Sequence, residues 1–442
     1  FKTGWTLDML DHWWPIVILV LACGTAVLGT LAFHFRDTIH RLRLSMSLFS
    51  GADQSDMFNR ISEIYPTSLV PASDSAYAFE AGLQMGLPRK VRFSDGYSDS
   101  ETFLRETDTS ALLVLKSGKI CYEQYGPTGG PDVPWLSWSM AKSFISAMVG
   151  VAVHDGHIKS IEDPVTNYVN ELKGSAYDGV RIKDVLQMSS GASWNEDYSD
   201  FKSDINRFAR VFAFGGSFTE FAASLKPARQ PGKYKLYNSV DTQVLGLLVA
   251  RATGKKITDY MRDTLWNPLG AEAPAHWILD SDGVEMSFGG LNATARDYAK
   301  LGELYRNGGM WREKQIVPKQ WVKDSLSVDS PHLAANAQLP PDAPSGYGQS
   351  LGYGYQWWLL DGDEGEFAAM GVYNQFIYVN PTRKITIVKL SSNRQYGVAQ
   401  TEACSKELES FAFFRAVAQT LGRADKGENI QDLTPLKTAS RA

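Results

Sequence analysis

Apolar residues form one long uninterrupted run near the N-terminus and only short runs of mixed periodicity further on. From Trp14 to Phe33 no residue is charged, and as a helix this stretch spans roughly 30 Å, the thickness of a bilayer core. Trp13 and Trp14 at one end and basic residues beyond the other are typical of membrane interfaces. The pattern predicts a membrane anchor over residues 1–44, with a single transmembrane helix over about 14–33.

Beyond the anchor, helical and alternating patterns are mixed, which predicts an α+β protein. The expected elements are a β-hairpin over 111–125, a buried helix over 144–153, a mostly helical region over 157–307 that includes a helix over 240–253, strands over 354–360, 375–379 and 385–390, and a helix over 402–421. Early and late strands around a helical insertion predict an antiparallel sheet with flanking helices, an inserted helical lobe, and a cleft between the two.

Polar composition sets the expected boundaries of this domain. Residues 45–103 are rich in Ser, Asp, Gly and Pro with short apolar patches, and we expect them to form an arm that wraps around the domain. The catalytic domain is expected over 104–425. The remaining residues, 426–442, are predicted to form a polar tail.

Candidate chemistry lies at the start of the buried helix, where Ser139 and Lys142 are three residues apart. This spacing puts both side chains on one helix face, one turn apart, so that the amine can hydrogen-bond the hydroxyl. Burial and the positive end of the helix dipole both lower the pKa of such a lysine, as a general base requires. The spacing alone is common: Ser199 and Lys202 share it in a polar run. The alternative for Ser139 is a helix cap beside a solvated lysine.

Two further motifs follow in order, Tyr237-Asn-Ser239 before an apolar helix and Ala369-Met-Gly371 before the late strands. With the Ser139–Lys142 pair, they make the chain from about Ala111 to Leu421 resemble the serine β-lactamase and penicillin-binding-protein superfamily, most closely its esterase and 6-aminohexanoate-dimer-hydrolase branch. The resemblance implies a β-lactamase/transpeptidase-like fold. It also implies a serine hydrolase that cleaves a small ester or amide through an acyl-serine intermediate.

The resemblance also assigns roles to single residues. Ser139 would be the nucleophile, Lys142 would keep a low pKa, and Tyr237 would act as a phenolate base or pass a proton to the leaving group, unless it is a core tyrosine. Backbone N–H groups of Ser139 and Val372 would form the oxyanion hole. Substrate contacts are expected from Tyr198, Ser239, Trp357, Met370 and Gly371. Trp357 and Trp358 alternate on a strand, so one of them faces the core.

Two positions depart from the penicillin-recognising members of the superfamily. The second motif ends in Ser239 where many members have Asn, and Ala369 stands where those members carry a cation. The first departure favours the hydrolase branch over a penicillin-type amide pocket, and the second leaves the choice of substrate open.

Composition narrows the partners and the compartment. A net charge of −5 and a pI near 5.9 give no basic surface for nucleic acid. The three cysteines, Cys23, Cys121 and Cys404, lack metal-ligand spacing, and we expect neither a metal nor a cofactor.

The expected partners are the small substrate, the lipid bilayer through residues 14–33, and a membrane protein. Arginines that follow the apolar run would place the domain in the cytoplasm, but the resemblance implies a single-pass protein with its catalytic domain outside it. The alternative function is an accessory subunit of a membrane complex, with little or no catalytic role.

Overall fold

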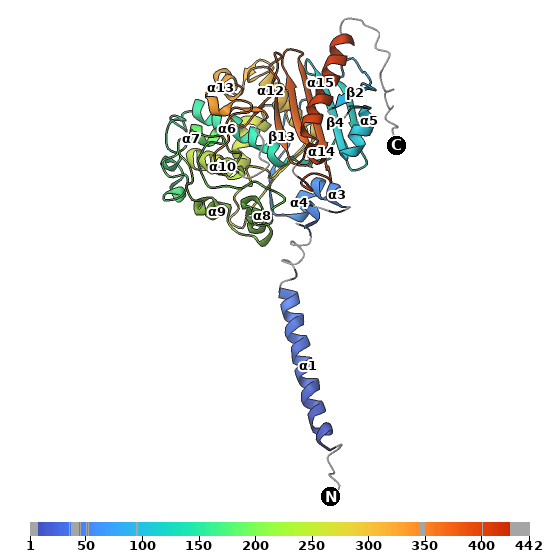
Figure 1. Cartoon of the computed structure of the whole chain (residues 1–442), viewed down its shortest axis with the longest axis vertical. Helices are drawn as coiled ribbons and strands as arrows, with labels where there is room; N and C mark the ends of the chain where they lie inside the picture. The colour runs from blue at the N-terminus through green and yellow to red at the C-terminus, as the bar shows by residue number, and fades with distance from the viewer. Residues whose placement is uncertain are drawn as a thin grey trace.

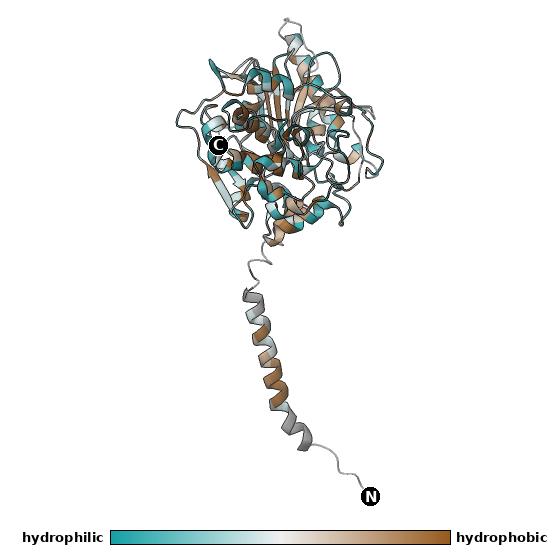
Figure 2. Ribbon diagram, turned by 90° about the vertical axis from the view of Figure 1, so that its left-hand side faces the viewer, coloured by the Kyte–Doolittle hydropathy of each residue, from teal (hydrophilic) through white to brown (hydrophobic). Residues whose placement is uncertain are grey.

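The computed structural model describes residues 8–34, 36, 44, 46–49, 51, 53–93, 96–343, 350–399 and 401–424. Helix α1 runs from Asp8 to His34 (Figures 1 and 2). Its described apolar side chains, among them Leu19 and Val20, are exposed. Within the ranges just given, no helix is long and apolar enough to cross a membrane. The transmembrane helix predicted over 14–33 therefore has no support from this structure, and the predicted tail over 426–442 lies outside the described residues.

A seven-stranded antiparallel sheet forms the centre of the domain, in the order β11-β12-β13-β14-β15-β4-β5. Its strands are β4 (Thr109–Lys116), β5 (Lys119–Tyr125), β11 (Gly352–Tyr353), β12 (Trp358–Leu359), β13 (Phe367–Gly371), β14 (Gln375–Asn380) and β15 (Ile385–Ser391). Early and late strands meet where β15 pairs with β4, so the expected hairpin and the two last strands are confirmed. Of the expected strand over 354–360, only Trp358–Leu359 forms a strand, β12, and residues 354–357 form the turn that joins it to β11, with Gln356 at a φ of 62°.

Side chains of the sheet alternate between two cores. On β14, Ile377 and Val379 belong to the core that α12 (Ala295–Arg306) covers, whereas Phe376 packs on the far face against Phe414 of α15 (Glu407–Ala424), with ring centroids 5.3 Å apart. Figure 1 shows α15 lying along that side of the sheet. Gly302 lets α12 approach closely, because a Cβ there would lie 2.8 Å from Ile377 Cγ2.

The helix predicted over 402–421 is interrupted. Lys406 adopts a left-handed conformation, with a φ of 56°, between α14 (Glu402–Ser405) and α15. The chain thus changes direction just before the long helix that covers the sheet.

The inserted lobe is mostly helical, as predicted (Figure 1). Its helices are α6 (Ala141–His154), α7 (Ile182–Leu186), α8 (Asp204–Phe214), α9 (Phe218–Ser224), α10 (Ser239–Thr253) and α11 (Ile257–Met261). Helices α6 and α10 pack together at its centre. Asn238 caps α10 by accepting a hydrogen bond from Val240 N, and Gly254 ends the helix in a left-handed conformation.

Residues of the predicted arm contribute to both parts of the fold. Strand β1 (Thr67–Val70) pairs with β7 (Ala275–Ile278) in a sheet of order β1-β7-β8-β6, and the β2–β3 hairpin packs beside α15. Further helices and strands of the domain are α3 (Gln54–Asn59), α4 (Ile61–Ile64), β2 (Val91–Phe93), β3 (Gly96–Ser98), α5 (Ser100–Glu106), β6 (Trp135–Leu136), the 3-10 helix η1 (Trp138–Met140), β8 (Leu291–Ala293), β9 (Met310–Trp311), β10 (Lys314–Gln315) and α13 (Lys319–Ser325).

Candidate active site

The Ser139–Lys142 pair lies at a sharp turn between β6 and α6. Trp138 has a φ of 45°, a conformation that costs free energy for a bulky residue, and it puts Ser139 on the short helix η1 immediately before α6. Lys142 follows in the first turn of α6, where its side chain is buried. Its Nζ lies 2.8 Å from Ser139 Oγ, as the sequence spacing predicted.

Lys142 Nζ has two further partners, Ser239 Oγ and Phe288 O, each at 3.1 Å. The carbonyl can only accept a hydrogen bond. Ser239 Oγ donates its own proton to a carboxylate oxygen of Glu196 at 2.6 Å, and so it too must accept from Lys142. A neutral amine has two N–H bonds and one lone pair. With both N–H bonds directed to these acceptors, the lone pair points to Ser139 Oγ, the direction that a general base needs.

Burial also sets the charge of this amine. Desolvation lowers the pKa of Lys142 to about 7, and the negative charge of Glu196 acts in the opposite direction. A substantial fraction of Lys142 is therefore neutral near neutral pH and can accept the serine proton.

Glu196 is the centre of this network, and the sequence analysis missed it. Its buried carboxylate accepts four hydrogen bonds, from Trp194 Nε1 at 2.5 Å, Tyr198 Oη at 3.0 Å, Ser239 N at 3.0 Å and Ser239 Oγ. The sequence signal that could have revealed Glu196 was the alternation Trp194-Asn-Glu196-Asp-Tyr198, because residues two apart in an extended segment face the same side.

Tyr237 lies beside the pair, in the segment just before α10. Its ring stacks on Trp358, with centroids 5.4 Å apart, and Lys142 Nζ lies 5.0 Å from the ring centroid. Burial and the charge of Glu196 raise the pKa of Tyr237, although a hydrogen bond with Ser139 opposes the rise. The phenol is therefore neutral. Of the two roles that the sequence left open, this disfavours the phenolate base and favours the proton donor.

Strand β13 forms the opposite wall of the site. Gly371 lies so close to η1 that a Cβ there would be 2.6 Å from Ser137 O and 3.1 Å from Ser139 N. This approach brings the backbone at Val372 next to that of Ser139, where the two N–H groups of the predicted oxyanion hole belong.

A cleft with a volume of about 380 Å³ opens in front of these residues. Ser139, Tyr198, Tyr237, Met370, Gly371 and Val372 all line it, whereas Ser239 lies beneath, buried against Lys142 and Glu196. Ser239 therefore contacts Lys142, which differs from its expected contact with substrate.

The expected substrate contact by Trp357 is wrong. Its side chain is fully buried between Tyr305 and Phe367, with ring centroids 4.6 and 5.2 Å away, and it does not line the cleft. Trp358 lines the cleft in its place. The turn at Gln356 decides which of the two tryptophans faces the core, because β12 begins only at Trp358.

The wall of the cleft is acidic. Glu196, Glu402 and Glu407 line it, and among its described residues none is Lys or Arg. Desolvation raises the pKa of both Glu402 and Glu407. The cleft thus offers carboxyl groups and apolar side chains to a substrate.

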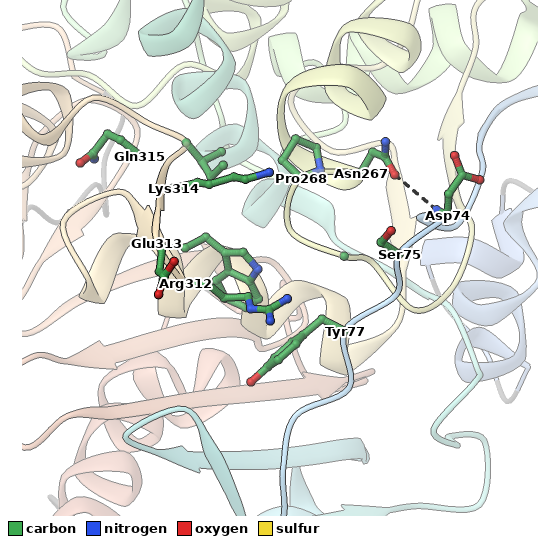
Figure 3. Close-up of a pocket in the computed structure, with 12 residues that line it drawn as sticks. Asp74, Ser75, Tyr77, Asn267, Pro268, Arg312, Glu313, Lys314 and Gln315 are labelled. Atoms are coloured by element: carbon green, nitrogen blue, oxygen red, sulfur yellow. Dashed lines mark hydrogen bonds between the residues drawn. The ribbon is translucent and has the colours of Figure 1, made fainter.

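A second and larger hollow, of about 1340 Å³, is drawn in Figure 3. Tyr77, Asn267 and Arg312 lie around it, and Arg312 packs over the Tyr77 ring at 5.5 Å. Ser75 and Lys314 both line it, but among the described residues no hydrogen bond joins the two side chains, unlike Ser139 and Lys142. Within the described part of the chain, no group of three or more His, Cys, Asp or Glu residues could hold a metal ion.

The alternative pair, Ser199 and Lys202, is exposed in the loop before α8, and Ser199 Oγ donates to Asp197. Geometry therefore favours Ser139 and Lys142 as the reactive pair. The fold and this site together define a serine hydrolase with the β-lactamase/transpeptidase architecture.

Comparisons with known proteins support the same class of protein. Residues 104–405 match the β-lactamase family, to which this chain belongs. The 6-aminohexanoate-dimer hydrolase of Paenarthrobacter ureafaciens is 30% identical over 342 residues, covering 76% of this chain and 84% of that protein. A solved structure from Bacillus anthracis, described as a candidate 6-aminohexanoate-dimer hydrolase, superposes with a TM-score of 0.74 at 23% identity and covers 87% of this chain and 97% of its own.

The fold also extends to more distant hydrolases. EstCE1, a hydrolase with promiscuous acyltransferase activity, superposes with a TM-score of 0.52 at 16% identity, over 66% of this chain and 91% of its own. Membership of the family makes this protein a serine hydrolase for amides or esters, as the sequence motifs predicted.

Proposed function

We propose that this protein hydrolyses a small, uncharged or cationic ester or amide through an acyl enzyme on Ser139. The observation that carries the proposal is the 2.8 Å contact between Lys142 Nζ and Ser139 Oγ, in a network that directs the amine lone pair at the hydroxyl. Lys142 takes the hydroxyl proton while Ser139 Oγ bonds to the substrate carbonyl carbon. The carbonyl oxygen becomes an oxyanion that the N–H groups of Ser139 and Val372 stabilise.

The tetrahedral intermediate then collapses, and the bond from carbonyl carbon to leaving group breaks. Tyr237 gives its proton to the leaving alcohol or amine and recovers a proton from the Lys142 ammonium. A water molecule next attacks the acyl carbon and loses its proton to Lys142. The bond from the acyl carbon to Ser139 Oγ then breaks, the acid leaves, and the Lys142 ammonium returns the proton to Ser139 Oγ. The complete cycle restores the starting protonation states of the three residues, so no cofactor is needed for the balance.

Turnover of a panel of p-nitrophenyl esters and anilides tests this function, with Ser139→Ala and Lys142→Ala as the variants. The proposal predicts hydrolysis by the native protein and the loss of nearly all of it in both variants, with the fold retained by circular dichroism. Equal turnover in native protein and Ser139→Ala would refute it.

Membrane attachment is a separate part of the proposal. In its favour, the described apolar side chains of α1 from Ile16 to Leu21 are all exposed and need an apolar partner. We propose that a bilayer is this partner and that the catalytic domain lies outside the cytoplasm. Flotation of the full chain with phospholipid vesicles, compared with a chain that begins at residue 45, tests the attachment, and protease protection in intact cells tests the side.

An accessory subunit without catalysis is the less favoured function. A scaffold gains nothing from a buried lysine whose three hydrogen bonds all converge on a reactive serine and its supports. Native mass measurement after membrane extraction would reveal a larger complex, and the turnover assay would show whether catalysis accompanies it.

A further inference from the structure

Four buried polar side chains come together beside α6, the helix that follows the reactive serine. They are Ser146 of α6, Tyr305 of α12, Trp321 of α13 and Trp357, which precedes β12. Each of these residues is at most 7% exposed. Within the described part of the chain, none of their side-chain N or O atoms has a hydrogen-bond partner. Buried polar atoms are almost always hydrogen-bonded, and each one that is not costs free energy.

The polar atoms of this cluster lie close to the hydroxyl of Tyr305. Burial raises the pKa of Tyr305 to about 12, and the rise is opposed by neighbouring polar groups, those of Trp357, Ser146, Ser325 and Trp321. A neutral N–H or O–H group acts on a phenol in this way only at close range. The rings of Tyr305 and Trp357 are in contact, with centroids 4.6 Å apart.

The shape of α6 brings Trp321 to the same place. A Cβ on Gly150 would lie 2.5 Å from Trp321 Cδ1, the carbon bonded to the indole nitrogen, so the absence of a side chain there lets the indole approach the helix. Ser146 precedes Gly150 by four residues and lies on the same helix face, one turn away. The N–H edge of Trp321 therefore lies against the surface of α6 that carries Ser146.

The chemistry of these four groups limits what can bind among them. The indole N–H groups of Trp321 and Trp357 only donate, so the bound group must accept two hydrogen bonds. The hydroxyls of Ser146 and Tyr305 donate and accept, so the bound group can also donate to them. An anion would accept from all four, but a buried charge needs a cationic partner, and none of the four side chains is a cation. A water molecule is neutral, accepts two hydrogen bonds and donates two.

We propose that one water molecule binds at this junction, where it accepts hydrogen bonds from Trp321 Nε1 and Trp357 Nε1 and donates to Ser146 Oγ and Tyr305 Oη. Such a molecule satisfies polar groups that lie near one another without bonding directly. The site joins α6, α12 and α13 to the turn before β12.

The bound water links the helix of the reactive lysine to the wall of the cleft. Lys142 lies in the first turn of α6, one turn before Ser146. Trp357 is held in the core by the same site, and the next residue, Trp358, lines the cleft and stacks on Tyr237.

Tyr305→Phe tests the site in solution, because it removes one acceptor of the water and keeps the ring. A hydroxyl without a partner would be lost at no cost, whereas a hydroxyl bonded to a buried water leaves that water unsatisfied. We expect urea unfolding to show a folding equilibrium constant that is about 5- to 150-fold lower than in the native protein.

Tyr260→Phe is the matched control. Tyr260 Oη is also buried without a partner among the described residues, but burial and the charge of Asp155 raise its pKa, and no neighbouring polar group in the described structure opposes the rise. Its removal should leave the folding equilibrium constant nearly unchanged. A Tyr305→Phe variant as stable as Tyr260→Phe would overturn the water site.

A high-resolution crystal structure of the full chain, from crystals grown in chloride and in bromide, identifies the bound group. The proposal predicts one solvent peak within hydrogen-bond distance of all four side-chain atoms, with no anomalous signal in bromide. A bromide ion at this place would show an anion site. Four side chains bonded directly to one another, with no solvent peak between them, would show that nothing binds there. Either result would overturn the proposal.

Discussion

Replacing Glu196 with glutamine tests the hydrogen-bond network that we hold responsible for the base. One carboxylate oxygen of Glu196 accepts hydrogen bonds from two N–H groups, those of the Trp194 ring and the Ser239 backbone. The other oxygen accepts from two hydroxyl groups, those of Tyr198 and Ser239. A glutamine has one oxygen and one NH₂ group. Because N–H groups cannot accept, its oxygen must face them, and its NH₂ then donates to the hydroxyls.

The Ser239 hydroxyl must consequently reverse and point its proton at Lys142. It then competes with Ser139 for the lysine lone pair. The loss of one charge-assisted hydrogen bond, about 1.5–3 kcal/mol, predicts a fall in kcat of about 10- to 150-fold in Glu196→Gln.

The pH profile separates this effect from a general loss of structure. Activity requires neutral Lys142, so kcat/KM rises with pH through the pKa of about 7. The charge of Glu196 raises that pKa, so its removal lowers the pKa and moves the rise to lower pH. In Glu196→Gln, kcat and the pKa of Lys142 should therefore both fall. Partial unfolding would instead lower the measured rate and leave the pH profile unchanged.

Glu366→Gln is the matched control, because Glu366 is as buried as Glu196, at 6% exposure, but bonds Tyr378 and Arg415 on the far face of the sheet. It should leave the pH profile unchanged. Stopped assays of p-nitrophenyl acetate turnover on either side of pH 7 measure both quantities. An unchanged kcat, or a rise that moves to higher pH in Glu196→Gln, would refute the reasoning.

Three further outcomes follow from the same site. Tyr237→Phe should fold normally and lose about two to four orders of magnitude in turnover, the range for a positioned proton donor, and near-normal turnover would show that Lys142 acts alone. Gly371→Ala should lower kcat about 10- to 100-fold by pushing β13 away from Ser137 O and the oxyanion hole, and unchanged kcat would contradict the close approach. Benzylpenicillin should be turned over negligibly, because the described lining of the cleft, with Met370 and three glutamates, offers its carboxylate no Lys or Arg; efficient hydrolysis would contradict this charge pattern.

Local features of the fold could be predicted from the sequence. Helices α6 and α10 carry apolar faces and begin and end at recognisable residues, and the spacing of Ser139 and Lys142 depends only on one helical turn. The central sheet could be predicted from strand patterns that occur both early and late in the sequence, such as those that form β4 and β15.

Features that depend on distant contacts could not be predicted. Glu196 gains its role from Ser239, 43 residues away, and Phe288 contributes a backbone carbonyl that no side-chain pattern reveals. Alternation showed that either Trp357 or Trp358 faces the core, but a one-residue offset at the preceding turn decides which. An apolar hollow beside Ser139 is lined by residues of α8 together with Leu48 and Phe49, which come from a region that the sequence offered only as a wrapping arm.

The most direct test of the central claim is to map the serine that becomes acylated. The native protein would be treated with a fluorophosphonate probe, digested, and sequenced by mass spectrometry, alongside Ser139→Ala and Ser199→Ala. The account predicts a single label on Ser139, lost in Ser139→Ala and retained in Ser199→Ala. A label on Ser199, or one that survives Ser139→Ala, would contradict it.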